Sequence, residues 1–185
     1  SRRAAIEYGH GMASEVIAYV AASLDGYIAG DEGTVDFLEQ FGSEEYGYHD
    51  YLESVGAVVM GSTTYEQILG WGWPYGSTPG LVLTSRSLEE PDGVAITFSS
   101  ESTGKAIRAF AATTPDRVWI VGGGTVILEG MRAGAVDTLE VYVMPVILGS
   151  GVPLFPGSYP GSLTLKDSKV FTNGVVKLTY STRSV

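Results

Sequence analysis

The chain has 185 residues, 44% hydrophobic and 17% charged, which indicates a globular domain with a sizeable core rather than a disordered segment. It contains no cysteine, so disulfides, thiolate nucleophiles and thiolate metal sites are excluded. The formal charge of −10 disfavours non-specific nucleic-acid binding, because phosphates would be repelled, although a local pocket can still hold an anion.

The N-terminal residues differ from the rest of the chain. Residues 1–14 show no clear periodicity, and Met12 is a candidate natural start. We expect residues 1–14 to be a cloning remnant and residues 15–185 to form a single domain. No apolar run approaches the roughly 18 residues of a membrane span, so we expect no membrane partner and a cytoplasmic protein.

The first elements are a strand and a loop. Residues 15–23 are strongly apolar and predict a buried, central strand. Residues 24–33 form a turn-rich loop in which Asp25 is typical of an Asx-type turn. Two helical stretches follow. Thr34 is the expected N-cap of a short first helix, and Ser43 that of a second helix over residues 43–54.

The middle of the chain alternates strands and helices. Residues 56–60 predict a buried strand that runs into Gly/Ser/Thr-rich residues 61–66, where a helix begins. An aromatic, Gly/Pro-rich loop over residues 71–80 leads to further strands at 81–84 and 94–98. Residues 102–112 then have the apolar face of an amphipathic helix.

The stretch over residues 118–128 is the centre of the pattern. Apolar strand residues run into Gly122, Gly123 and Gly124, and an apolar helix follows to about Arg132. Such a junction lets main-chain N–H groups approach a phosphate closely. The glycine spacing is neither Gly-x-Gly-x-x-Gly nor a Gly-Lys-Ser/Thr phosphate loop. The alternative is that these glycines only make a tight turn.

The last third of the chain predicts antiparallel strands. Residues 137–145 alternate, and residues 147–155 form a loop rich in turn formers. Asn173-Gly174 between two apolar runs is a strong hairpin signal. The whole pattern predicts a three-layer α/β fold, with a mixed, mainly parallel central sheet, helices on both faces and a C-terminal antiparallel hairpin.

Three strand ends share polar or glycine-rich chemistry: residues 61–64, 84–86 and 122–125. In an open α/β sheet, ligands bind outside the carboxyl ends of the strands. These segments would offer main-chain N–H groups, hydroxyls and one guanidinium along one edge. That combination suits a pyrophosphate together with a ribose phosphate.

The same segments carry a family resemblance. Residues 22–29 read Ala-Ser-Leu-Asp-Gly-Tyr-Ile-Ala, and residues 60–66 read Met-Gly-Ser-Thr-Thr-Tyr-Glu. With Leu-Thr-Ser-Arg at 83–86, Ile-Val-Gly-Gly-Gly at 120–124 and the run at 145–155, the chain resembles the dihydrofolate reductase-like superfamily. It is most similar to the branch of the riboflavin-biosynthesis deaminase–reductase, its C-terminal reductase domain and stand-alone relatives. The resemblance spans residues 16–180.

The resemblance implies NADPH as the cofactor, a small heterocyclic (pterin- or pyrimidine-like) substrate that receives the hydride, and a homodimer. The implied cofactor contacts are Ala21 and Ile28 at the nicotinamide, Gly61, Ser62, Thr63 and Thr64 at the pyrophosphate and adenosine side, Ser85 and Arg86 at the adenosine ribose and 2′-phosphate, and Gly122, Gly123, Gly124 and Thr125 at the pyrophosphate.

Two departures bear on the substrate and the coenzyme. Ser62 stands where folate-reducing relatives often have a basic 2′-phosphate ligand, so a preference for NADPH over NADH depends mainly on Arg86. Ile127 replaces a tyrosine of the folate reducers, and their tryptophan-bearing loop is not evident after Ile28. These differences count against dihydrofolate as the substrate.

Catalytic side chains are harder to predict. Asp36 is our candidate for the proton donor, because it begins a helix just after the loop; alternatively it only complements the helix dipole. Tyr65 and Trp73 are candidates for the apolar wall of a substrate pocket; alternatively, Trp71 and Trp73 are core or interface aromatics. His49 lies in a polar, aromatic-rich run and is interpreted as a surface or packing residue.

Three functional hypotheses follow. The first is an NADPH-dependent reductase, in which the protein binds and orients while the cofactor supplies the hydride. The second is a nucleotide-binding or sensory module of the same fold without turnover. The third is a structural dimer subunit, with the strand over residues 138–144 and the C-terminal hairpin as candidate homodimer surfaces.

Overall fold

The computed structural model describes residues 14–183 and contains two sheets and five helical segments in that range. The strands are β1 (Val16–Ser23), β2 (Tyr27–Ala29), β3 (Val55–Gly61), β4 (Gly80–Leu83), β5 (Ile96–Ser99), β6 (Arg117–Gly122), β7 (Thr138–Met144), β8 (Val152–Pro153), β9 (Thr164–Val170) and β10 (Val176–Ser181). The helices are the 3₁₀ segment η1 (Asp36–Phe41), α1 (Tyr48–Glu53), α2 (Ser62–Trp71), α3 (Thr103–Ala111) and α4 (Gly124–Arg132).

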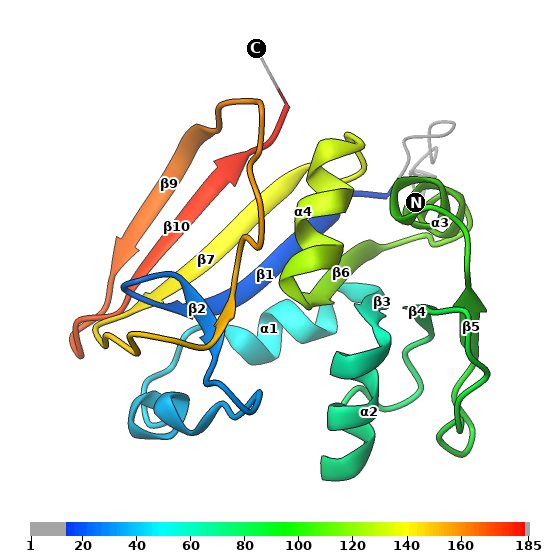
Figure 1. The fold of residues 1–185 in the computed structure, drawn as a ribbon, viewed down its shortest axis with the longest axis horizontal. Helices are drawn as coiled ribbons and strands as arrows, with labels where there is room; N and C mark the ends of the chain where they lie inside the picture. Colours follow the sequence, from blue (N-terminus) through cyan, green and yellow to red (C-terminus); the bar gives the residue numbers. More distant parts are fainter. Residues whose placement is uncertain (1–13, 184–185) are drawn as a thin grey trace, which may run out of the picture.

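Eight strands form the main sheet in the order β5-β4-β3-β6-β1-β7-β10-β9 (Figure 1), and β2 pairs with β8 in a small second sheet. The pairings from β5 to β7 are parallel, and β10 is antiparallel to both β7 and β9. The prediction of a mixed, mainly parallel sheet with a C-terminal antiparallel pair is therefore confirmed.

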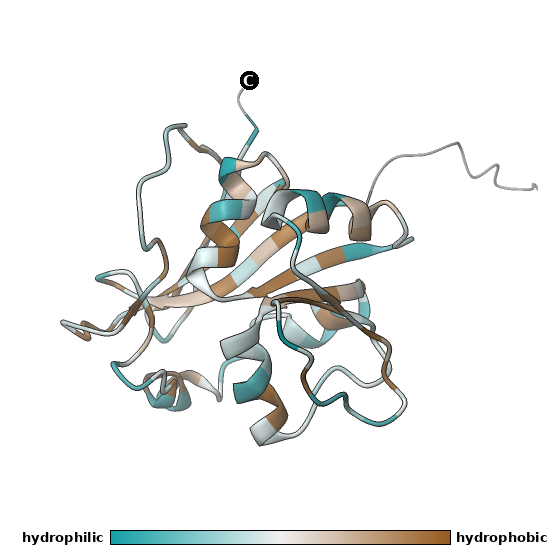
Figure 2. Cartoon of the chain, turned by 45° about the vertical axis from the view of Figure 1, so that its right-hand side comes forward, coloured by the Kyte–Doolittle hydropathy of each residue, from teal (hydrophilic) through white to brown (hydrophobic). Residues whose placement is uncertain are grey.

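Both faces of the central strands are covered. Helices α3 and α4 bury Ile107, Ile127 and Met131 against one face, and α2 buries Tyr65 and Ile68 against the other. Figure 2 shows the hydrophobic residues concentrated in the central strands, with hydrophilic residues on the outer helix surfaces. Since neither face of these strands meets water, their sequences are nearly continuous apolar runs. None of the helices in residues 14–183 has the length and hydropathy that a bilayer crossing requires.

The helix starts near the first loop differ from the prediction. Val35 rather than Thr34 is the N-cap of η1, and Gly47 rather than Ser43 is the N-cap of α1. Gly47 has a φ of 75°, which glycine adopts without steric cost, so the chain turns there rather than at the serine. The loop over residues 24–33 also contains strand β2, whose partner β8 is distant in sequence.

Strand β7 was a candidate homodimer surface, but it cannot pair edge to edge with a second copy. The strand lies between β1 and β10, so both of its edges are hydrogen-bonded. Its alternation instead reflects the two faces of the sheet, with Leu139, Val141, Tyr142 and Met144 buried. The C-terminal hairpin does form, and its strand β9 is at the edge of the sheet with most side chains exposed.

Candidate functional site

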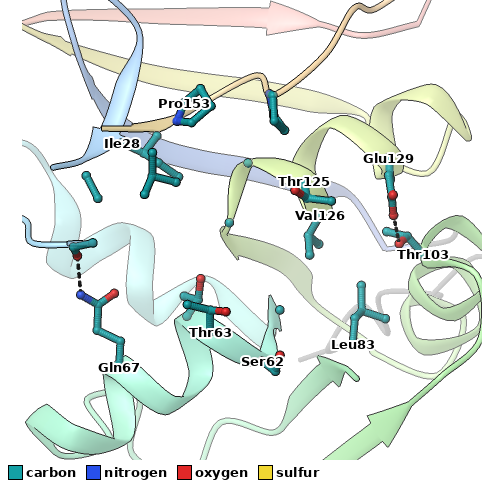
Figure 3. A pocket seen from close by; sticks show the side chains of 18 residues that line it. Ile28, Ser62, Thr63, Gln67, Leu83, Thr103, Thr125, Val126, Glu129 and Pro153 are labelled. Atoms are coloured by element: carbon teal, nitrogen blue, oxygen red, sulfur yellow. Dashed lines mark hydrogen bonds between the residues drawn. The ribbon is translucent and has the colours of Figure 1, made fainter. Parts of the chain in front are cut away.

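A cavity of about 570 Å³ lies beyond the C-terminal ends of β3 and β6, between the first turns of α2 and α4 (Figure 3). The ends of two parallel strands meet at this edge, so each chain segment leaves its strand and enters a helix beside the cavity. The lining residues are Ile28, Ala29, Gly33, Gly61, Ser62, Thr63, Thr64, Gln67, Leu83, Thr103, Gly123, Gly124, Thr125, Val126, Glu129, Val152, Pro153 and Pro156.

The first junction connects β3 to α2. Gly61 caps α2 in an extended conformation, with φ −80° and ψ 166°, and no side chain hydrogen-bonds to this cap. The first-turn N–H groups of α2, on Ser62, Thr63 and Thr64, therefore have no hydrogen bond to a capping side chain. These N–H groups and the helix dipole favour negative charge in the cavity.

The second junction connects β6 to α4 and has the same form. Gly123 caps α4 with φ −81° and ψ −172°, again without a side-chain hydrogen bond. A Cβ atom at Gly123 would find only Thr64 Oγ1 nearby, at 3.6 Å, so the first junction lies against the second. Two helix N-termini thus open on one cavity.

Gly124 has a different reason to be glycine. A Cβ atom there would lie 2.4 Å from the Pro153 carbonyl oxygen and 2.5 Å from that of Leu154. Only glycine permits this approach of α4 to the segment around β8. Close packing rather than ligand access therefore explains Gly124, whereas Gly123 lies at the cavity without such a backbone contact.

The polar groups of the cavity are nearly all uncharged. Hydroxyl groups come from both helix starts, on Ser62, Thr63, Thr64 and Thr125. Among the lining residues within the described range 14–183, Glu129 is the only ionisable one, and Thr103 Oγ1 donates a 2.6 Å hydrogen bond to its carboxylate. An anion here would be held by main-chain N–H groups and hydroxyls rather than by lining cations.

One end of the cavity is apolar. Ile28 and Ala29 from β2 face Val152 and Pro153 from β8, since these two short strands pair with each other. Gln67 Nε2 in α2 donates a 2.6 Å hydrogen bond to the Gly33 carbonyl oxygen, which ties α2 to the loop after β2. The opposite end contains Leu83, Thr103 and Glu129 (Figure 3).

Of the expected cofactor contacts, eight line this cavity: Ile28, Gly61, Ser62, Thr63, Thr64, Gly123, Gly124 and Thr125. Ala21, Ser85, Arg86 and Gly122 are not among the lining residues. The Arg86 guanidinium instead forms a two-pronged ion pair with Glu66, at 3.2 and 2.8 Å. This hydrogen-bonded pair lowers the pKa of Glu66 and raises the pKa of Arg86.

The other expected side chains lie elsewhere. Asp36 is exposed at the start of η1 and does not line the cavity. Tyr65 is fully buried and donates a 2.6 Å hydrogen bond to the Glu89 carbonyl oxygen. Trp73 packs edge-on against Tyr65 and Tyr75 in the same core. Neither aromatic lines the cavity: Trp73 fits the core alternative, whereas Tyr65 was expected at the pocket wall and is a core residue instead.

His49 is exposed beside Glu53, with 3.3 Å between the imidazole and the carboxylate, as expected for a surface histidine. In the part of the chain that the structure describes, no three His, Asp or Glu side chains gather in a way that could hold a metal ion.

Sequence reasoning missed the far wall of the cavity, which Gln67, Glu129 and the segment around Val152–Pro153 provide. The run over residues 145–155 was recognised as part of the resemblance, but without a role.

The RibD C-terminal domain family matches residues 14–177. The chain belongs to this family. The chain is 34% identical over 172 residues to the uncharacterized protein YwjB of Bacillus subtilis, and the match covers 89% of this chain and 96% of that protein.

Solved structures agree with this assignment. A putative riboflavin biosynthesis protein from Shewanella has a TM-score of 0.72 and 28% identity, and the match covers 90% of this chain and 98% of that one. A dihydrofolate reductase from Enterococcus faecalis, in complex with NADP(H) and RAB-propyl, has a TM-score of 0.63 and 21% identity, covering 90% and 95%. The RibD C-terminal domain of this chain therefore has a reductase-type, dihydrofolate reductase-like fold.

Proposed function

We propose that this protein is an NADPH-dependent reductase that transfers a hydride to a small heterocyclic, pterin- or pyrimidine-like substrate. One observation carries the proposal: two glycine-capped helix N-termini, at Gly61 and Gly123, open on one cavity. Two neighbouring phosphates of a dinucleotide match two such helix ends. The reductase-type family supports the redox assignment.

The residues present fit a dinucleotide. The volume of about 570 Å³ lies within the range of roughly 300–1,000 Å³ that is typical of small-molecule sites. The caps of α2 and α4 have no side-chain hydrogen bond, so the first-turn N–H groups remain available to a ligand. Gly123 adds no side chain at the point where the two junctions meet.

The three parts of the cavity suggest how the dinucleotide lies. The pyrophosphate would meet the first turns of α2 and α4. The nicotinamide would lie against the apolar surface of Ile28 and Pro153, and the adenosine against Leu83, Thr103 and Glu129. When bound, the coenzyme supplies the hydride, while the chain binds, orients and excludes water.

Preference for NADPH depends on Arg86. The guanidinium must turn from Glu66 to meet a 2′-phosphate, and both side chains of this ion pair are about half exposed, at 55% and 47%. An exposed ion pair of this kind is screened by solvent and adds little to stability, so a phosphate can compete with the carboxylate. Ser85 is exposed next to Arg86 and would join this contact.

Asp36 remains our proposed proton donor. Phe37, which follows it, packs in the same cluster as Ala21, so the start of η1 lies near the C-terminal half of β1. We also propose a homodimer, supported by the exposed Leu165 and Val170 on the edge strand β9. Sedimentation at micromolar concentration would give a monomer if this part of the proposal is wrong.

The test of the main proposal is a titration of the protein with NADPH, NADH and ADP, followed by thermal shift and coenzyme fluorescence. A ligand at 100 times its Kd stabilises the fold by about 2.7 kcal/mol, so binding will be visible as a rise in Tm. NADPH is expected to raise Tm and NADH to raise it less. No shift with either coenzyme would refute the proposal.

A second candidate is coenzyme binding without turnover. The exposed position of Asp36, outside the cavity, is the observation that favours it. The reductase proposal predicts steady oxidation of NADPH with at least one pterin or pyrimidine. Binding without oxidation across a panel of both classes would favour the second candidate.

A further inference from the structure

Asp25 joins two chain segments that are far apart in the sequence. Its carboxylate follows the end of β1 and accepts hydrogen bonds from the main-chain N–H groups of Leu148, at 3.1 Å, and Gly149, at 2.7 Å. The hydroxyl of Ser23, the last residue of β1, donates to the same carboxylate at 2.6 Å. Both carboxylate oxygens are therefore engaged.

The contacts continue from this carboxylate to the cavity wall. Ser23 is buried, and its hydroxyl oxygen accepts a 2.9 Å hydrogen bond from the N–H of Tyr27, the first residue of β2. The N–H of Leu154 donates to the Gly26 carbonyl oxygen at 2.9 Å. Asp25 thus lies at the point where the chain entering β2 meets the chain entering β8.

These two segments supply the apolar end of the cavity. They contribute Ile28 and Ala29 on one side and Val152 and Pro153 on the other. Their approach is close, because a Cβ atom at Gly151 would lie 2.2 Å from the Ala29 carbonyl oxygen. A shift of either segment would move the apolar end of the cavity, and a shift of the β8 segment would also reach the start of α4, because Gly124 packs against Pro153 and Leu154.

We propose that Asp25 is a positioning residue, which holds β2 and β8 together and so shapes the end of the cavity that receives the nicotinamide. The inference rests on the proposed function for the identity of the ligand. Asp25 does not line the cavity, and it acts on the ligand only through these two segments. Sequence reasoning saw a local Asx turn, but the partners at Leu148 and Gly149 are long-range.

The first test is hydrogen exchange of the Asp25→Asn variant, which needs no ligand. The carboxylate accepts a hydrogen bond on each of its two oxygens. In asparagine one of these oxygens is replaced by an NH₂ group, which is a donor and cannot accept the hydrogen bond from the main-chain N–H that faces it. Amides over residues 27–29 and 148–154 are expected to exchange faster, with α2 unchanged. The control is Glu32→Gln, which removes the same charge from an exposed residue of the same loop. Faster exchange confined to Leu148 and Gly149 would overturn the inference.

The second test compares Kd for NADPH with Kd for 2′,5′-ADP, which lacks the nicotinamide. Asp25→Asn is expected to raise Kd for NADPH about fivefold, the effect of one ordinary hydrogen bond, and to change Kd for 2′,5′-ADP by less than about twofold. An equal change for both ligands, or no change for either, would show a merely structural role and overturn the inference.

Ser23→Ala provides a second variant should Asp25→Asn fold poorly. It keeps the charge of Asp25 but removes the hydroxyl that connects the carboxylate to β2. The same selective loss of NADPH affinity, of smaller size, is expected. If the wild-type protein binds neither ligand, the proposed function fails, and hydrogen exchange alone then decides the role of Asp25.

Discussion

The β3–α2 and β6–α4 junctions look alike in sequence and in backbone, but their glycines have different tasks. Gly61 and Gly123 both cap a helix in an extended conformation without a side-chain partner. Only the second junction continues into a glycine, Gly124, that lies against the carbonyl groups of Pro153 and Leu154. One helix start is therefore free at its outer side, and the other is fixed to the opposite wall of the cavity.

This difference separates glycines that serve the fold from glycines that serve a ligand. A glycine run after a strand is compatible with a tight turn or with an anion site, and the sequence could not distinguish them. The structure assigns packing to Gly124, and the proposed function assigns ligand access to Gly123. The two substitutions below separate these tasks.

The largest effect is expected for Gly124→Ala. The new Cβ would overlap two main-chain carbonyl oxygens, which cannot move aside as a flexible side chain can. We expect the free energy of unfolding to fall by about 3 kcal/mol, at the upper end of overpacking costs, and Tm to fall with it. Urea denaturation measures this; a loss below about 0.5 kcal/mol would contradict the packing role.

Gly123→Ala is the matched variant, for which we expect little loss of stability but a loss of NADPH affinity. Its φ of −81° suits alanine, and its Cβ would find Thr64 Oγ1 at an ordinary 3.6 Å. The free energy of unfolding should change by less than about 1 kcal/mol. The methyl group would occupy the point where the two helix starts meet, so Kd for NADPH should rise about tenfold. Unchanged affinity in calorimetric titration would refute the ligand role.

Local sequence signals predicted most of the main elements and part of the cavity. The strands of the main sheet, the helix over residues 103–111 and the hairpin at Asn173-Gly174 were predictable, because their periodicity and turn residues are local signals; the short strands β2 and β8 were not. Seven cavity residues were predictable because strand ends in a parallel sheet meet at one edge, and Ile28 was predictable only from the family resemblance.

The remainder depends on long-range contacts. Nothing local to Glu129 or to the segment around Pro153 reveals that they face Thr103 and Gly124. Nothing local to Arg86 reveals its pairing with Glu66, 20 residues earlier. The buried position of Tyr65 likewise depends on the loop that covers it, since its hydroxyl bonds to Glu89.

A smaller effect is expected at the first junction. Glu66→Gln removes the charge that holds Arg86, so Kd for NADPH should fall about threefold while Kd for NADH stays constant. Arg86→Gln should weaken the binding of NADPH and leave the binding of NADH unchanged. Fluorescence titration with both coenzymes measures the ratio of Kd for NADH to Kd for NADPH. If neither variant changes this ratio, Arg86 does not contact the coenzyme.

The smallest expected effect is a loss of the hydrogen bonds to Asp25 at low pH. Hydrogen bonds from Ser23, Gly149 and Leu148 lower the pKa of Asp25 below its usual 3.8. A carboxylate with a depressed pKa contributes stability above its unfolded-state pKa, and that contribution is lost as pH falls through the lower, folded-state value. The amides of Leu148 and Gly149 should therefore lose protection only below about pH 4, before those of α2. If the amides of α2 lost their protection at the same pH, the effect would not be local to the contacts of Asp25.

The central claim, that two helix N-termini hold one diphosphate, is tested most directly by amide nuclear magnetic resonance during an NADPH titration. The account predicts that the N–H signals of Ser62–Thr64 and of Gly124–Val126 shift together and give one Kd. Shifts confined to one helix start, or absent from both, would contradict it.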